Sequence, residues 1–266
     1  MTRYALVTGA SAGIGAAFAR ELAAGGHALV LTARRGERLD ALAAELRARH
    51  AVDVRCIPCD LADPHAPQFL FDEILRLGIA IDVLINNAGY GVTGSFVSRP
   101  WATHAEFIQV MLTAPTELCH RLLAGMRERG YGRIINVASL AGLIPAPAGH
   151  TLYAASKAYL IKFSQALALE NRAHGINVCA LCPGFTYSEF HDVNGARAQL
   201  KGMPAWMWMH AEPVVRDALA ATERGEIVRV SGRINRTIKR VFKLLPDRLA
   251  LYLVDRRGKD FRVADD

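Results

Sequence analysis

The stretch YALVTGASAGIG, residues 4–15, joins an apolar strand pattern to a glycine-rich turn and then to a helix pattern. Glycines at positions 9, 13 and 15 allow a tight turn and the close approach of another backbone. The helix that follows has free N–H groups at its start, which can bind a pyrophosphate. The stretch therefore predicts a strand–turn–helix unit that binds a nucleotide. A tight connection without a ligand would show the same pattern.

The same alternation continues to about residue 230. Continuous apolar runs, typical of strands covered on both faces, occupy residues 4–9, 27–33, 52–59, 81–89, 132–139 and 176–184. Helix patterns lie between them, at residues 13–26, 34–50, 65–77 and 104–130, and around residue 155. This order predicts a single-domain, doubly wound α/β fold with a parallel sheet and helices on both faces.

Composition agrees with a folded soluble domain. The chain has 266 residues, of which 52% are hydrophobic and 21% charged, as in ordinary globular proteins. No run of about 18 apolar residues occurs, and the N-terminal residues lead directly into the first strand without the pattern of a signal peptide. We expect a cytoplasmic protein.

Two C-x-x-C pairs raise the question of a metal or redox site. The five cysteines are Cys56, Cys59, Cys119, Cys179 and Cys182. Both pairs fall in strand patterns, where residues three apart point to opposite faces and chelate poorly. We therefore expect buried free thiols that pack as small apolar groups, and no metal.

Five motifs occur in one order along the chain: TGASAGIG, NNAG (residues 86–89), Ser139 in NVAS, YAASK (residues 153–157) and PG (residues 183–184). Together they resemble the short-chain dehydrogenase/reductase family over about residues 3–230. The resemblance implies a Rossmann-type domain with about seven strands, usually a homodimer or homotetramer. It also implies reversible hydride transfer between a nicotinamide cofactor and an alcohol or carbonyl compound.

The candidate catalytic residues are Ser139, Tyr153 and Lys157. A spacing of four residues places Tyr153 and Lys157 on one face of a helix. We expect the Lys157 cation to lower the pKa of Tyr153, which then gives a proton to the carbonyl oxygen or takes it back. In the family the serine hydrogen-bonds the same oxygen and the lysine also binds the nicotinamide ribose. Alternatively, Tyr153 and Lys157 merely share a helix surface.

The end of the second strand indicates which cofactor is used. An acidic residue there would accept hydrogen bonds from the ribose of NAD, but the sequence is Ala33-Arg34-Arg35. A guanidinium suits a 2′-phosphate, so we favour NADP(H). Alternatively, Arg34 only solvates the start of a helix. The cofactor-binding residues implied by the resemblance are Gly9, Ser11, Gly13, Ile14, Gly15, Arg34, Asp60, Leu61, Asn87, Ala88, Gly89, Tyr153, Lys157, Pro183, Gly184 and Thr186.

One position departs from the family. Where the family has an asparagine that helps to hold a water beside the lysine, this chain has Met111, whose thioether is a weak acceptor. Pro115 lies four residues later, lacks an N–H and kinks the helix, which leaves the Met111 carbonyl free to hold that water. Alternatively, Met111 only packs.

The substrate side is apolar. Residues of about 187–212 correspond to the substrate lid of the family and contain Trp206, Met207, Trp208 and Met209, which are large, adaptable apolar groups. We predict an NADP(H)-dependent oxidoreductase that interconverts a small apolar carbonyl compound and its secondary alcohol. The alternative, motivated by Met111, is a non-catalytic nucleotide-sensing binding protein.

The C-terminal residues are separate in character. We predict a catalytic domain over residues 1–232 and a basic amphipathic tail over residues 233–266. Residues 229–262 carry eleven Lys and Arg and three Asp and Glu, in a chain of net charge +7. The sequence favours docking of this tail on its own domain over contact with an anionic membrane. It contains no nucleic-acid recognition module.

Overall fold

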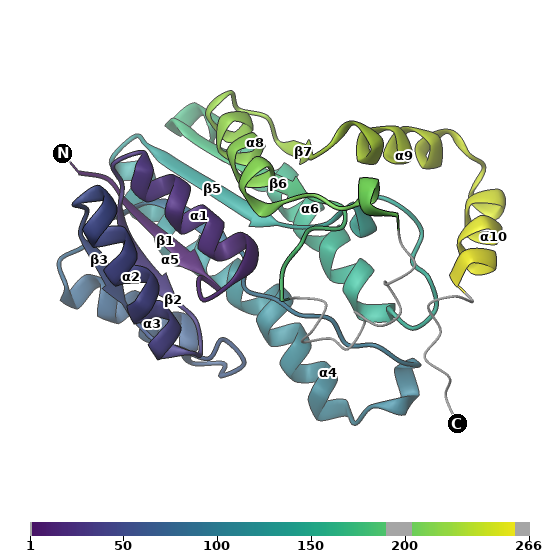
Figure 1. Cartoon of the computed structure of the whole chain (residues 1–266), viewed down its shortest axis with the longest axis horizontal. Coiled ribbons are helices and arrows are strands. Elements are labelled where there is room, and N and C mark those ends of the chain that lie inside the picture. The colour runs from purple at the N-terminus through teal and green to yellow at the C-terminus, as the bar shows by residue number, and fades with distance from the viewer. Residues whose placement is uncertain (1, 190–203, 259–266) are drawn as a thin grey trace.

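Seven parallel strands form one twisted sheet with helices on both sides (Figure 1), as seen in a computed structural model that describes residues 2–189 and 204–258. The strands are β1 (Tyr4–Thr8), β2 (Ala28–Thr32), β3 (Val54–Cys56), β4 (Ile81–Asn86), β5 (Gly132–Val137), β6 (Ile176–Cys182) and β7 (Val228–Val230). The helices of these described residues are α1 (Gly13–Ala24), α2 (Gly36–His50), α3 (Ala66–Arg76), α4 (Trp101–Ile108), α5 (Ala114–Glu128), α6 (Thr151–Asn171), α8 (Ala211–Glu223), α9 (Arg233–Leu244) and α10 (Asp247–Gly258). The predicted fold class is confirmed.

The strand order is β3-β2-β1-β4-β5-β6-β7. The chain runs outward from β1 to β3, returns to the centre, and then runs outward in the other direction from β4 to β7. The reversal lies between β1 and β4, and ligands of such sheets bind at the carboxyl ends of the strands at this point. The topology therefore fixes one edge of the sheet as the place for a site.

Two apolar layers hold the helices to the sheet. Side chains alternate along β1, where Ala5 and Val7 face one layer and Leu6 faces the other. The first layer packs the sheet against α1, α2 and α8, and the second packs it against α3, α5 and α6. Because both faces are covered, the strands are continuous apolar runs, which explains why the sequence pattern predicted them.

The long helix predicted for residues 104–130 is interrupted. Helix α4 leads into a π-turn, Gln109–Thr113, and α5 begins directly after it. Pro115 is the second residue of α5 and has no N–H to donate to the turn before it. The structure has a π-turn that ends just before Pro115, and the predicted kink at Pro115 stays a prediction.

The cysteines agree only in part with the prediction of buried free thiols. All five are free, and Cys119, Cys179 and Cys182 are buried, but Cys56 and Cys59 are partly exposed. Four strands lie between β3, which carries Cys56, and β6, which carries Cys179 and Cys182. Burial raises the pKa of Cys179 to about 11, which disfavours the thiolate that metals and redox partners need.

No helix of the described residues combines the length and the apolar character needed to cross a membrane. Within residues 2–189 and 204–258, no group of three or more His, Cys, Asp and Glu side chains is placed to hold a metal ion.

Candidate active site

The first component of the candidate site is the turn between β1 and α1. Gly9 has a φ of +65°, which residues with a Cβ rarely adopt. A Cβ on Gly15 would lie 2.3 Å from the carbonyl oxygen of Gly9 and 2.5 Å from Nδ2 of Asn87. The turn is therefore folded tightly against the residues after β4. No side chain caps the N-terminus of α1 at Ala12, so its N–H groups can bind an anion.

Thr8, the last residue of β1, joins this turn to the end of β4. Its Oγ1 accepts hydrogen bonds from the backbone N–H groups of Asn87 at 2.9 Å and Ala88 at 3.0 Å. It also donates to the carbonyl of Ile85 at 3.2 Å. Nδ2 of Asn87 in turn donates to the carbonyl of Thr8 at 2.9 Å. The two strand ends on either side of the reversal are thus held together by side chains.

The second component lies at the carboxyl ends of β5 and β6. Ser139 follows β5 and begins a short turn. The N–H of the next residue, Leu140, donates to the carbonyl of Pro183, which follows β6, at 2.9 Å. A Cβ on Gly142 would lie 2.6 Å from the carbonyl carbon of Lys157. The turn therefore packs directly on the backbone of α6.

Tyr153 and Lys157 lie one turn apart on α6, beside Ser139. Nζ of Lys157 is 5.7 Å from the centre of the Tyr153 ring and donates to the carbonyl of Val137, the last residue of β5, at 2.7 Å. Tyr153 is hydrogen-bonded with Ser139. The predicted catalytic residues are therefore brought into one cluster by β5 and α6.

Hydrogen bonds between buried asparagine side chains support this cluster. Nδ2 of Asn86 donates to Oδ1 of Asn136 at 2.9 Å and to the carbonyl of Pro115 at 3.2 Å. Nδ2 of Asn136 donates to Oγ of Ser164 at 2.8 Å. These bonds join β4, β5, α5 and α6. Oδ1 of Asn86 is buried and has no hydrogen-bond partner in the described part of the chain.

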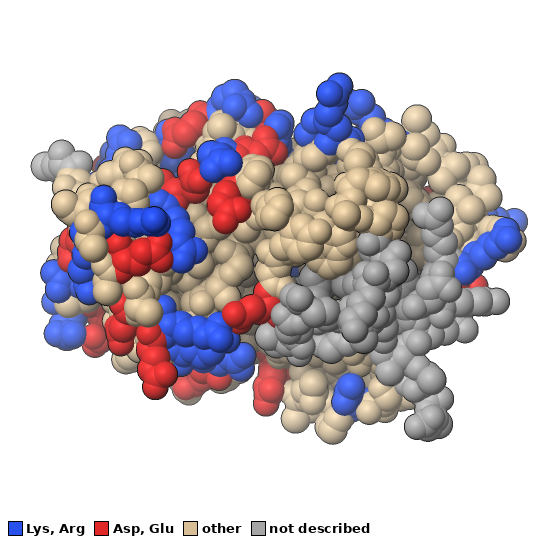
Figure 2. Space-filling view, in the orientation of Figure 1, with Lys and Arg blue, Asp and Glu red and all other residues tan. Residues whose placement is uncertain are grey.

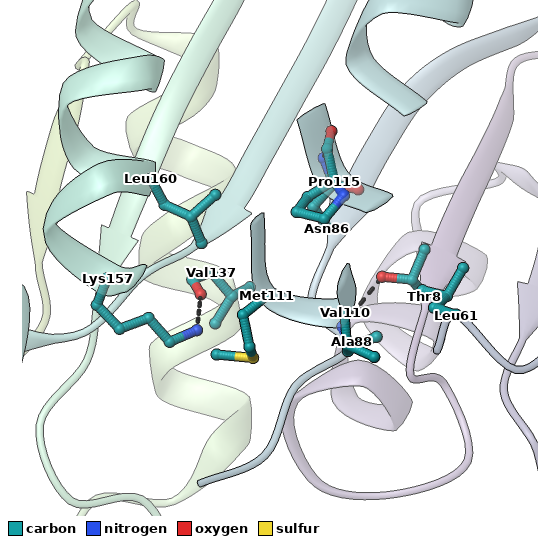
Figure 3. Close-up of a pocket in the computed structure, with 10 residues that line it drawn as sticks. All are labelled: Thr8, Leu61, Asn86, Ala88, Val110, Met111, Pro115, Val137, Lys157 and Leu160. Carbon is teal, nitrogen blue, oxygen red and sulfur yellow. Dashed lines mark hydrogen bonds between the residues drawn. The ribbon is translucent and has the colours of Figure 1, made fainter. Parts of the chain in front are cut away.

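A cavity of about 10 Å³ lies between Lys157 and the π-turn (Figure 3). This volume is close to the smallest that holds one water molecule. Its lining includes Asn86, whose Oδ1 is unpaired, and Met111, whose carbonyl has no N–H at position 115 to accept from. Lys157 also lines it and has N–H groups beyond the one bonded to Val137. The lining therefore includes polar side chains from both β4 and α6.

A surface hollow at the end of β2 is lined by three arginines, Arg34, Arg35 and Arg38, together with Gly36 and Glu37. Nη1 of Arg35 donates to Oε2 of Glu189 at 3.0 Å, and Nη1 of Arg38 donates to Oε1 at 2.6 Å. Hydrogen bonds from Arg38 and then Arg35 hold the pKa of Glu189 below its ordinary value. Nη2 of Arg35 also donates to Oγ of Ser11 in the glycine turn, at 3.1 Å. The arginines of this hollow thus bind a carboxylate, and the hollow lies next to the glycine turn between β1 and α1.

The sequence model of the family described as short chain dehydrogenase matches residues 3–198. This range contains the glycine turn, the cluster on β5 and α6, and the arginine hollow. The chain belongs to the short-chain dehydrogenase/reductase family. It is therefore an oxidoreductase, as the resemblance of its motifs implies.

Several short-chain dehydrogenases are similar to this chain over most of its length. The 3-oxoacyl-[acyl-carrier-protein] reductase FabG of Aquifex aeolicus is 30% identical over 239 residues, which are 86% of this chain and 96% of that protein. A short-chain dehydrogenase from Sphingobium yanoikuyae, solved in complex with NADPH, is 32% identical, with a TM-score of 0.80 over 92% of this chain and 96% of that one. The bulky-bulky ketone specific alcohol dehydrogenase from Comamonas testosteroni is 31% identical, with a TM-score of 0.75 over 92% and 95%.

The ionisation of this short-chain dehydrogenase's cluster differs from the sequence-based prediction. Burial raises the pKa of Tyr153 to about 12, and the hydrogen bond with Ser139 only partly opposes it. The net shift is therefore opposite in direction to the predicted lowering, because burial dominates. Burial also lowers the pKa of Lys157 to about 8, because a desolvated ammonium group is less stable. The surroundings thus favour the neutral form of both groups.

All of the predicted site residues follow the carboxyl ends of β1 to β6 or lie on the adjoining helices. Gly15, Leu61, Lys157, Pro183 and Thr186 are buried. Leu61 is buried in an apolar cluster with Met111, and Thr186 is buried with its Oγ1 donating to the carbonyl of Gly184 at 3.2 Å. Their roles stay predictions. Of the predicted lid, residues 190–203 lie outside the described residues.

Three residues of the site escaped the sequence analysis. Arg38 follows Arg35 by three positions on a helix, a spacing that could have grouped them. Asn86 stands in the NNAG motif, of which only residues 87–89 received a role. Glu189 gave no signal, because its arginine partners lie about 150 positions earlier in the chain.

The raised pKa of Tyr153 makes a prediction that needs no substrate. The phenol should stay protonated well past pH 10, where exposed tyrosines ionise, because burial penalises the phenolate. Ultraviolet difference titration of the wild type minus Tyr153→Phe should show no phenolate signal below about pH 10. A signal that titrates near pH 7 and is absent from the variant would contradict the assignment.

Proposed function

We propose that this oxidoreductase uses NADP(H) to interconvert an apolar carbonyl compound and its secondary alcohol, with Tyr153 as the proton donor and acceptor. The observation that carries the proposal is the cluster of Ser139, Tyr153 and Lys157 beside the glycine turn, at the edge of the sheet where the strand order reverses. Proton transfer and cofactor binding are thereby combined at one place.

The residues present fit a phosphorylated nicotinamide cofactor. The uncapped start of α1 suits a pyrophosphate. The hollow at the end of β2 suits a 2′-phosphate, since Arg35 and Arg38 already bind the carboxylate of Glu189 and Arg34 lines the same hollow. At the strand end, Ala33 stands in place of an acid. When bound, the cofactor supplies the hydride.

The cluster supplies and stabilises the proton. With a pKa raised to about 12, Tyr153 carries its proton at neutral pH and can give it to the carbonyl oxygen during reduction. Ser139, hydrogen-bonded with Tyr153, can hold the same oxygen in position. Below about pH 8, Lys157 is an ammonium group, which stabilises the phenolate that the transfer leaves. Alcohol oxidation uses the same groups in reverse.

The small cavity completes a path for the returning proton. One water in it would accept from Nζ of Lys157 and donate to the carbonyl of Met111 or to Oδ1 of Asn86. Backbone and Asn86 together thus replace the asparagine that the family has at position 111. Met111 instead packs its sulfur against Gly89, where an added Cβ would come within 2.8 Å of it.

Aromatic side chains support an apolar substrate. The ring of Trp208 lies 5.4 Å from that of Phe185 and 5.1 Å from that of Tyr187, centre to centre. The N–H of Tyr187 donates to the carbonyl of Met209 at 2.9 Å, which fixes the segment after β6 against the lid. Trp206, two residues before Trp208 in the chain, is exposed. The Comamonas relative is named for bulky ketones and the Aquifex relative for 3-oxoacyl groups.

A panel of carbonyl compounds tests the proposal, with NADPH absorbance as the readout. Apolar ketones and 3-oxoacyl thioesters should be reduced faster than small polar aldehydes. Tyr153→Phe should lower kcat at least 100-fold, since a positioned acid contributes on the order of 10²–10⁴, and should bind NADPH like the wild type. If no compound oxidised NADPH faster with the wild type than with Tyr153→Phe, the non-catalytic nucleotide-sensing alternative would replace the proposal.

Arg34 should determine cofactor preference. A charge-assisted contact with a phosphate is worth about tenfold or more in affinity. Arg34→Ala should therefore weaken NADPH binding by about that factor and leave NADH binding unchanged, as measured by quenching of protein fluorescence. Arg49→Ala, an exposed arginine at the other end of α2, serves as the control. Equal affinity of the wild type for NADH and NADPH would contradict the assignment.

The relay depends on Pro115 more than on the side chain at 111. Met111→Asn should change kcat only modestly, because the backbone already supplies an acceptor. Pro115→Ala should lower kcat by about tenfold, since the new N–H can bond the Met111 carbonyl and occupy it. Circular dichroism and NADPH affinity serve as controls for folding. A larger loss in Met111→Asn than in Pro115→Ala would contradict the relay.

A further inference from the structure

Helices α9 and α10 expose an unusual share of the apolar surface. Of sixteen large apolar side chains that are exposed in the described residues, seven lie on these two helices. They are Ile234, Val241, Leu244, Leu249, Leu251, Tyr252 and Leu253. Among residues 233–256, whose burial the structure describes, these helices bury only Asn235 and Ala250, and Ile238 packs partly against the sheet. Docking on the domain, as the sequence favours, would leave most of this apolar surface in water.

Helix α9 combines this surface with positive charge. Ile234, Ile238, Val241 and Leu245 recur at helical spacing on one side. The remaining surface carries five cations and no acid: Arg233, Arg236, Lys239, Arg240 and Lys243. None of the five forms an ion pair with another described residue, whereas most other clustered arginines of the protein do. Residues 233–258 contain eight Lys and Arg and two Asp, a net of +6 in a chain of +7.

The two helices lie at one end of the molecule, opposite α2 and β3 (Figure 1). In Figure 2 the described surface toward this end is mostly uncharged, with Lys and Arg at its upper and right-hand margins. The first turn of α9 also adjoins the substrate side of the site. A Cβ on Gly184 would lie 2.5 Å from Nδ2 of Asn235, which donates to Sδ of Met209 at 3.6 Å.

We propose that α9 and α10 bind the surface of an anionic lipid bilayer, lying in its interface rather than crossing it. An exposed apolar side and unpaired cations are the two signals that together give stable interfacial binding. A second copy of the chain fits less well, since a symmetric contact through the apolar side would leave the five cations of each copy without an anionic partner. Nucleic acid would leave the exposed leucines in water.

Sedimentation with lipid vesicles tests the proposal on the full-length protein. The protein should sediment with phosphatidylcholine vesicles that contain phosphatidylglycerol, and not with phosphatidylcholine vesicles alone. Binding should fall as salt is raised, because the attraction is screened. Absence of binding to the anionic vesicles, or equal binding to both kinds, would overturn the proposal.

Two comparisons of variants test the contribution of the cations and that of the apolar side chains separately. Arg240→Gln with Lys243→Gln should weaken vesicle binding about 25-fold, at about fivefold for each cation, whereas Lys162→Gln with Arg172→Gln, exposed cations near α6, should not. Leu251→Asp should weaken it at least tenfold. Leu75→Asp should not, although Leu75 and Leu251 are both 56% exposed.

Analytical ultracentrifugation tests whether a second copy of the chain, rather than a lipid bilayer, covers this surface. The proposal expects the α9 and α10 variants to keep the oligomeric state of the wild type and its NADPH affinity. If they changed the oligomeric state and left vesicle binding unaltered, the surface would be an interface between copies and the proposal would be overturned. Equal losses in the control variants would also overturn it.

Discussion

The hydrogen bond from Nζ of Lys157 to the carbonyl of Val137, at 2.7 Å, is the interaction on which the site depends. A buried ammonium group is tolerated only where fixed acceptors replace the water it has lost. Here the acceptor is the end of β5, which also begins the turn carrying Ser139. Gly142 allows that turn to reach the backbone of Lys157. One buried cation thus fixes the distance between the central sheet and the helix that carries Tyr153.

The same burial bears on the proposed proton relay beside Met111. Burial raises the pKa of Tyr153 and lowers that of Lys157. The π-turn before Pro115 borders a cavity of about 10 Å³ next to Lys157, and the buried Oδ1 of Asn86, a lining residue, has no hydrogen-bond partner among the described residues. We propose that acceptors on the helix and on β4 take the place of a polar side chain at position 111.

Local patterns predicted the fold, because a covered strand is a continuous apolar run and a glycine turn is a short motif. They also predicted the residues at the strand ends, since topology brings such ends to one edge. Three properties depend on contacts between distant segments of the chain and could not be predicted from local sequence patterns. Glu189 meets Arg35 and Arg38 across about 150 positions. The direction of the Tyr153 pKa shift depends on burial by several elements. The exposure of Leu244, at 85%, depends on how little of α9 the domain covers.

The central claim is direct hydride transfer coupled to proton donation by Tyr153. The most direct measurement supplies NADPH deuterated at the transferred position of C4, together with the best carbonyl substrate, and analyses the alcohol by mass spectrometry. The account predicts one deuterium at the former carbonyl carbon with the wild type, and a formation rate at least 100-fold lower with Tyr153→Phe at equal cofactor occupancy. An alcohol without deuterium, or equal rates for the two proteins, would contradict it.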